Sequence, residues 1–234
     1  RTETPLGKSF YDLDYLVRSL SIQYELSSEM LNRDSRARLA ENQLLGIGFS
    51  QKERPVGTIQ SNGSLPGTEN EIKFLQAAIE GKYLLGNMGS KQRFLNLAKD
   101  YDILHLAVHG TADSLDRYKS SLIFNGASDN VLNTGDLYLA GLKSRLAVLS
   151  ACESGVGVVN KGEGTFSIAR GFSLVGVPSI VMSLWKVNDE ATSTLMKDMY
   201  DGFIYNDKPI NEALREAKIR YLEKNDEYFS HPYY

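Results

Sequence analysis

The chain contains little of what would mark several protein classes. With one cysteine in 234 residues, it can form neither an internal disulfide framework nor a multi-cysteine metal site. A lone thiol persists best in a reducing compartment, so we expect a cytoplasmic location. The formal net charge is only −3, with both signs interspersed, which does not favour direct nucleic-acid binding. No run approaches the roughly 20 apolar residues that cross a bilayer, so we expect no membrane association.

The remaining composition is that of a globular protein with a core. Apolar residues make up 42% of the chain and charged residues 24%. Residues 1–4 include neither a starting Met nor an apolar signal region. We therefore expect the sequence to be a fragment of a longer chain.

The first 65 residues give weak signals. Apolar alternation over residues 15–22 predicts a strand or two, and the apolar run 44–49 predicts a buried strand. Residues 60–68 are rich in Ser, Asn, Gly and Pro and predict a loop. Thr68 and Glu71 then have the spacing of a capping box, which predicts a helix running to about residue 81.

From residue 68 onward the pattern alternates between helix and strand. Strands buried on both faces are read as nearly continuous apolar runs. Repeated strand–helix–strand units imply an α/β fold, with a mainly parallel sheet covered by helices on both faces. Ligand sites in such sheets lie at the carboxyl ends of the strands. The runs that predict strands are 102–109, 145–150 and 179–185, and the expected later helices are 90–99, 134–142, 165–175, 188–202 and 210–224.

Two reactive side chains stand at the ends of predicted strands. His109 ends the first apolar run, and Cys152 comes just after the second. If these strands are neighbours, the imidazole and the thiol converge at one edge, where the imidazole favours the nucleophilic thiolate. Gly110 would let a substrate approach closely and would offer a backbone N–H.

Position alone leaves the functional interpretation open. Free cysteines are among the most buried residues, and a single Cys with a distant His does not identify a family. His105 and His109 would suggest zinc if they lay on a helix. In a strand their side chains share a face but stand ~13 Å apart. We therefore predict no metal, expect His105 to be a core or rim residue, and assign no role to His231.

Four motifs identify a family. HLAVHG at 105–110, LSACESG at 149–155, GEG at 162–164 and SLWKVND at 183–189 occur in the order and spacing of the CHAT domain. The chain therefore resembles CHAT domains, which are caspase-like modules usually attached to tetratricopeptide repeats and distantly related to separase. The resemblance covers almost the whole chain.

The resemblance implies a fold and an activity. The fold would be a single caspase-like three-layer sandwich over residues 1–234, with an N-terminal part (1–65) and a catalytic part (66–234). The activity would be that of a cysteine endopeptidase with His109 and Cys152 as catalytic dyad and no cofactor. The backbone N–H groups of Gly110 and Cys152 would form the oxyanion hole. The partners would be a protein substrate and either N-terminal tetratricopeptide repeats or a regulatory partner, in a bacterial defence or cell-death pathway.

Three residues are candidates for binding substrate. An acidic residue in the corresponding segment of separase lies in the pocket for a basic residue before the cleaved bond, which makes Asp189 a candidate. Glu153 is another, and Trp185 would wall the pocket. The plainer interpretations remain open: solvated charge for Glu153 and Glu163, helix-dipole stabilisation for Asp189, and core packing for Trp185.

Two other functions remain open. A catalytically silent caspase-like interaction module would share the fold, but would not need His109 and Cys152 together. A thiol-dependent acyltransferase would use the same dyad with another acceptor. The sequence departs from the usual CHAT pattern at both ends, where we expect the terminal strands to be missing, and this bears on autonomous folding more than on the dyad.

Overall fold

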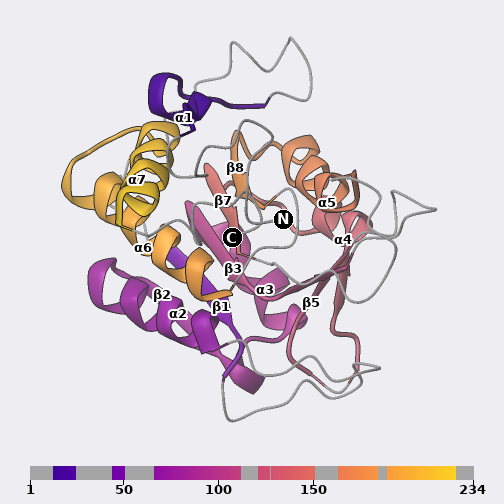
Figure 1. The fold of residues 1–234 in the computed structure, drawn as a ribbon. Coiled ribbons are helices and arrows are strands. Elements are labelled where there is room, and N and C mark those ends of the chain that lie inside the picture. Colours follow the sequence, from indigo (N-terminus) through magenta and orange to yellow (C-terminus); the bar gives the residue numbers. More distant parts are fainter. Residues whose placement is uncertain are drawn as a thin grey trace.

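A parallel sheet of five strands forms the middle layer of this computed structural model (Figure 1). The order across the sheet is β2-β1-β3-β7-β8, and every neighbouring pair is parallel. The strands are β1 (Leu44–Gly48), β2 (Gly81–Leu85), β3 (Ile103–Ala107), β7 (Leu146–Leu149) and β8 (Ser179–Met182). The structure describes residues 13–24, 44–50, 66–111, 121–126, 128–150, 163–183 and 189–224.

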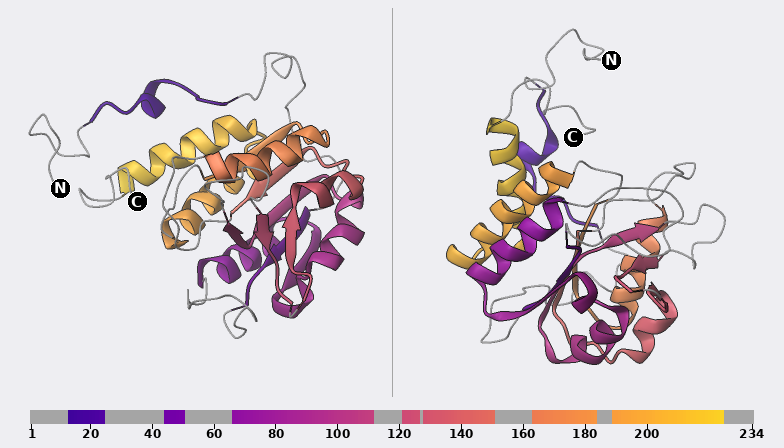
Figure 2. Two further views of the ribbon diagram at one scale, coloured as in Figure 1. Left: turned by 90° about the vertical axis from the view of Figure 1, so that its right-hand side faces the viewer. Right: turned by 90° about the horizontal axis from the view of Figure 1, so that it is seen from below.

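Helices cover both faces of this sheet (Figures 1 and 2). One outer layer contains α2 (Pro66–Ala78), α6 (Asp189–Tyr205) and α7 (Ile210–Lys224). The other contains α3 (Lys91–Leu97), α4 (Thr134–Leu139) and α5 (Glu163–Leu174), with the short 3-10 turns Gly86–Met88 and Ala98–Asp100 next to α3. The predicted α/β three-layer sandwich is confirmed. None of the described helices is long and apolar enough to cross a membrane.

A second, antiparallel sheet begins where β3 ends. Its strands are β4 (His109–Thr111), β5 (Ser121–Ile123) and β6 (Val131–Asn133), in that order. The predicted strand 102–109 is therefore wrong at its end, because β3 stops at Ala107 and His109 already pairs with β5. An unbroken apolar run does not reveal where a chain changes its pairing partner.

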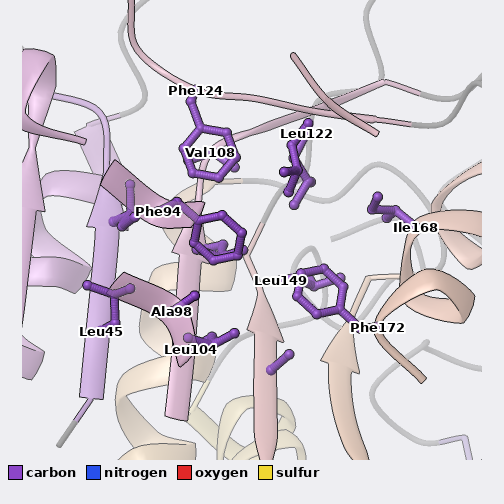
Figure 3. Packing of buried hydrophobic residues seen from close by; sticks show 14 of the residues in the cluster. Leu45, Phe94, Ala98, Leu104, Val108, Leu122, Phe124, Leu149, Ile168 and Phe172 are labelled. Carbon is purple, nitrogen blue, oxygen red and sulfur yellow. The ribbon is translucent and has the colours of Figure 1, made fainter. Parts of the chain in front are cut away.

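Two apolar cores explain why the central strands are apolar on both faces. Alternate β3 residues point to opposite sides, so Ile103 belongs to the core under α2, α6 and α7, whereas Leu104 and Leu106 belong to the other. In that second core, the rings of Phe94 and Phe124 lie 5.3 Å apart between centroids. Figure 3 shows these rings together with Phe172 from α5 and the aliphatic side chains of the sheet.

The predicted strand at residues 15–22 is wrong. The structure has a single helical turn there, α1 (Leu16–Ser19), which lies beside α7. A guanidinium nitrogen of Arg215 on α7 donates to the carbonyl oxygen of Arg18. Leu16, Leu20 and Ile22 are all more than half exposed. These residues alternate as strand residues would, but they do not pack on a sheet.

The predicted capping box at Thr68 and Glu71 is also wrong. Helix α2 begins at Pro66, so Thr68 lies inside its first turn, where proline is well suited to open the helix. The Thr68 hydroxyl donates to the carbonyl oxygen of Phe49, just after β1, at 3.4 Å. The Glu71 side chain is buried and points to the sheet. Both side chains join α2 to the sheet instead of closing its end.

The start of β2 requires glycine. A Cβ added to Gly81 would lie 2.1 Å from the carbonyl oxygen of Leu44 in β1. We expect Gly81→Ala to lower the free energy of unfolding by about 1–3 kcal/mol, because backbone atoms cannot yield as a flexible side chain can. Urea unfolding measures this loss. Gly135→Ala in α4 is the control, since a Cβ there meets nothing within 4 Å. Equal midpoints for the two variants would contradict the prediction.

Candidate active site

Two neighbouring strands lead to the residues of the candidate dyad. β3 and β7 pair in parallel, with Leu106 opposite Leu149. In the sequence, His109 comes three residues after Leu106, and Cys152 comes three residues after Leu149. The expectation that the two strands are adjacent is confirmed. The carboxyl ends of parallel strands meet at one edge of a sheet, which is where α/β proteins place their sites.

His109 is held at this edge by both sheets. It is the first residue of β4, opposite Ile123, and only 8% of it is exposed. Its imidazole packs on the ring of Phe49, with 4.7 Å between centroids and 48° between planes. Gly110 follows opposite Leu122 and is partly exposed. Strand pairing therefore fixes the backbone of His109, and the Phe49 ring supports its imidazole.

The other predicted site residues lie outside the described part of the chain. This holds for Cys152, Glu153 and Trp185, and for the side chain of Asp189, whose backbone begins α6. Their roles, and the oxyanion hole at Gly110 and Cys152, stay predictions. No cluster of three potential metal ligands occurs among the residues that the structure describes.

His105 is the centre of a buried polar cluster below the edge. It lies in the middle of β3, opposite Gly46, and is fully buried, so the core position expected for it is confirmed. Its Nδ1 lies 3.0 Å from the hydroxyl oxygen of Tyr200 on α6. Its Nε2 lies 3.1 Å from Oε1 of Glu71 on α2, although this contact is not aligned as a hydrogen bond.

The partners of His105 indicate where its protons lie. Burial, then the charges of Glu71 and Tyr83, raise the pKa of Tyr200 well above its usual value. A raised pKa keeps the phenol protonated at neutral pH, and we assign the His105 ring proton to Nε2, so that the Tyr200 hydroxyl donates to Nδ1. The Nε2–H then lies toward Oε1 of the Glu71 carboxylate, as a close polar contact that is not aligned as a hydrogen bond. This assignment gives each of the three groups a compatible role.

Ser150 connects this cluster to the candidate nucleophile. Its hydroxyl donates to Oε2 of Glu71 at 3.0 Å, and both residues are buried. Ser150 is the first residue after β7 and stands two residues before Cys152. We will call Glu71, His105, Ser150 and Tyr200 the buried polar cluster. The sequence analysis missed it, although Glu71 beside Ile72 and four residues before Leu75 lies on the apolar face of its helix.

Two glycines of β1 let α2 come close enough for this cluster. A Cβ on Gly46 would lie 2.7 Å from Cδ1 of Tyr83, and one on Gly48 would lie 2.8 Å from Cγ1 of Ile72. Larger side chains at these positions would displace the Tyr83 ring over β1 and push Ile72, and with it α2, away from the sheet. The missing side chains therefore help to bring Glu71 within reach of β3.

The arrangement defines a class of protein. A parallel α/β sandwich with a histidine at the carboxyl edge, beside the strand that leads to a cysteine, is the caspase-like arrangement. The model of one family, the CHAT domain, matches residues 5–234, so the chain belongs to the CHAT domain family. No curated protein matches the sequence.

The buried polar cluster should contribute measurably to stability. Tyr200→Phe removes the donor to His105 in a fully buried site. We expect the free energy of unfolding to fall by about 1–3 kcal/mol, the usual loss when a buried polar atom keeps no partner. Urea unfolding followed by circular dichroism measures it. The matched control is Tyr205→Phe on the same helix, where the side chain is 67% exposed. Equal losses in the two variants would contradict the assignment.

Proposed function

We propose that this CHAT domain is a cysteine endopeptidase that cleaves a protein substrate with His109 and Cys152. The observation that carries the proposal is the pairing of β3 with β7, from whose ends the chain continues to His109 and to Cys152. Membership of a family with a caspase-like fold supports it. A scaffold without catalysis would need neither residue type at these positions.

The mechanism follows from the chemistry of the two side chains. The Cys152 thiolate attacks the scissile carbonyl carbon, and the carbonyl oxygen becomes an oxyanion that accepts from backbone N–H groups at Gly110 and Cys152. His109, as imidazolium, protonates the leaving amine when the C–N bond breaks. Water then attacks the thioester, and its proton returns to His109. The new carboxyl end leaves and the thiolate is restored.

Substrate choice and control are part of the same proposal. Asp189, at the start of α6, would attract a basic residue before the cleaved bond, with Glu153 and Trp185 beside it. Attached tetratricopeptide repeats or a regulatory partner would switch the domain on, in a bacterial defence or cell-death pathway. These finer points rest on the family resemblance.

The dyad can be tested directly. We expect Cys152→Ala to abolish both peptide cleavage and labelling by an electrophilic thiol probe. We expect His109→Ala to lower kcat by a factor of about 10²–10⁴, the usual contribution of general acid–base catalysis. The measurement is cleavage of a peptide library by the full-length protein, with and without its natural partner.

Matched controls separate the dyad from the fold. Ser144 is buried but lies before β7, where its hydroxyl donates to the carbonyl oxygens of Ala98 and Tyr101. Ser144→Ala should therefore lose stability without losing the chemistry. If the wild type neither cleaves nor labels, even with its partner present, the silent interaction module is the better account. Labelling without hydrolysis, with transfer to an added amine, would instead favour an acyltransferase.

Asp189 makes a separate prediction about specificity. Asp189→Asn removes a negative charge, so cleavage after Arg or Lys should weaken by about 10–100-fold in kcat/KM, as for loss of a charged hydrogen bond. Cleavage of a matched uncharged substrate should change little. Asp201→Asn is the control, because it lies about 18 Å further along α6. An unchanged preference in Asp189→Asn would contradict the acidic pocket.

A further inference from the structure

We propose that Glu71 is a positioning residue, which anchors the start of the Cys152 segment to the buried core through Ser150. This inference deepens the proposed function and rests on it. Glu71 would act through Ser150, so its action would be indirect. Three elements meet at its carboxylate: α2, which carries it, β3, through His105, and the end of β7, through Ser150.

The first step concerns the carboxylate itself. Glu71 is 2% exposed, and a charge at that depth has lost its water. Its Oε2 accepts from the hydroxyl of Ser150 at 3.0 Å, and its Oε1 lies 3.1 Å from Nε2 of His105, close but not aligned as a hydrogen bond. A hydrogen bond to a charged acceptor in a dry site is among the stronger ones. Ser150 is therefore restrained more firmly than a serine after a strand would be by packing alone.

The second step concerns His105 as a support for Glu71. Its ring is held from the other side by Tyr200, which donates to Nδ1 and packs edge-on at 5.5 Å between centroids. His105 also sits in the central strand of the sheet, with neighbours on both edges. The carboxylate is thus fixed against the most rigid part of the fold, and Ser150 is fixed in turn.

The third step concerns the same helix and the other member of the dyad. Thr68, three residues before Glu71, donates to the carbonyl oxygen of Phe49, and the Phe49 ring packs on His109. The hydroxyl of Ser193 on α6 donates to the carbonyl oxygen of Gly67 at 3.4 Å. Helix α2 therefore contacts Phe49, which packs on His109, and Ser150, which precedes Cys152. It is also hydrogen-bonded to α6.

The functional consequence follows from geometry. A nucleophile and its partner act at hydrogen-bond distance, and a displacement of about 1 Å can cost 10²-fold in rate. Ser150 stands two residues before Cys152, so a displacement of Ser150 reaches Cys152 across only two peptide bonds. Loss of the Glu71 anchor should lower kcat, with little effect on KM because Glu71 does not contact substrate.

The experiment uses two substitutions at Glu71. Glu71→Met keeps a similar volume but cannot accept from Ser150. Glu71→Gln keeps an acceptor for Ser150, and its amide can donate to His105 if Tyr200 and His105 exchange donor and acceptor roles. We expect kcat to fall by about 10²-fold in Glu71→Met and by only a few fold in Glu71→Gln. Glu69→Gln, which disrupts an ion pair with Lys73 on the outside of the same helix, should match the wild type.

A double-mutant cycle tests the route through Ser150. Ser150→Ala removes the donor, and the combined variant with Glu71→Met should be no slower than the slower single variant, because both remove one interaction. Urea unfolding of each variant gives its folded fraction, so rates are compared per folded molecule. Additive losses in kcat, or equal losses in Glu71→Met and Glu71→Gln, would overturn the proposal.

A readout independent of peptidase activity separates this inference from the proposed function. Cys152 is the chain's one cysteine, so iodoacetamide alkylation can be followed by mass spectrometry on the tryptic peptide 146–161. If Cys152 lies against His109 as a thiolate, the alkylation rate at pH 7 should fall about 10-fold in Glu71→Met. If the wild type cleaves no peptide but alkylation is still slower in Glu71→Met, only the proposed peptidase activity is contradicted. Unchanged alkylation and unchanged kcat in Glu71→Met would sink the positioning role.

Discussion

One buried carboxylate constrains how the parts of this domain meet. Removing a charge from water costs several kcal/mol, and only well-placed partners offset that cost. Glu71 accepts a hydrogen bond from Ser150 at the end of β7 and lies 3.1 Å from Nε2 of His105 in the central strand. Helix α2 therefore cannot slide or rotate on the sheet without leaving the carboxylate uncompensated. The glycines of β1 also let α2 come close, because side chains at Gly46 and Gly48 would collide with Ile72 of α2 and displace the Tyr83 ring.

Local pattern was enough to predict most of the architecture. Doubly buried parallel strands have a distinctive composition, which located β3, β7 and β8, and α7 begins and ends as predicted. The pattern did not reveal β2, which is largely exposed, or β5 and β6, which have only three residues each. It was misleading at residues 15–22, where apolar alternation occurs in a segment without a sheet partner. Strand pairing depends on residues far apart in the sequence, so it cannot be predicted from a single run of residues.

Only part of the candidate site could be predicted from the sequence, for the same reason. The position of His109 at the carboxyl edge could be predicted, because strand ends in a parallel sheet share that edge. The cluster around Glu71 could not, since its members come from α2, β3, α6 and the end of β7. Thr68 and Glu71 show the difficulty most clearly. Their spacing is that of a capping box, yet both side chains turn to the sheet, because tertiary contacts there override the local option at the helix end.

His109 and the residue that leads to Cys152, Ser150, are restrained in different ways, and this bears on regulation. His109 is fixed by strand pairing in β4 and by the Phe49 ring, so it should change little while the two sheets stay intact. The chain leading to Cys152 leaves β7 through Ser150, whose restraint depends on a helix outside the sheet. Helices that pack on a sheet shift more readily than strands within it. An effector that moves α2 would therefore act on the nucleophile side directly, through Glu71 and Ser150. It would act on His109 only through the Phe49 ring, because the imidazole's own strand pairs with β5 and not with the helix.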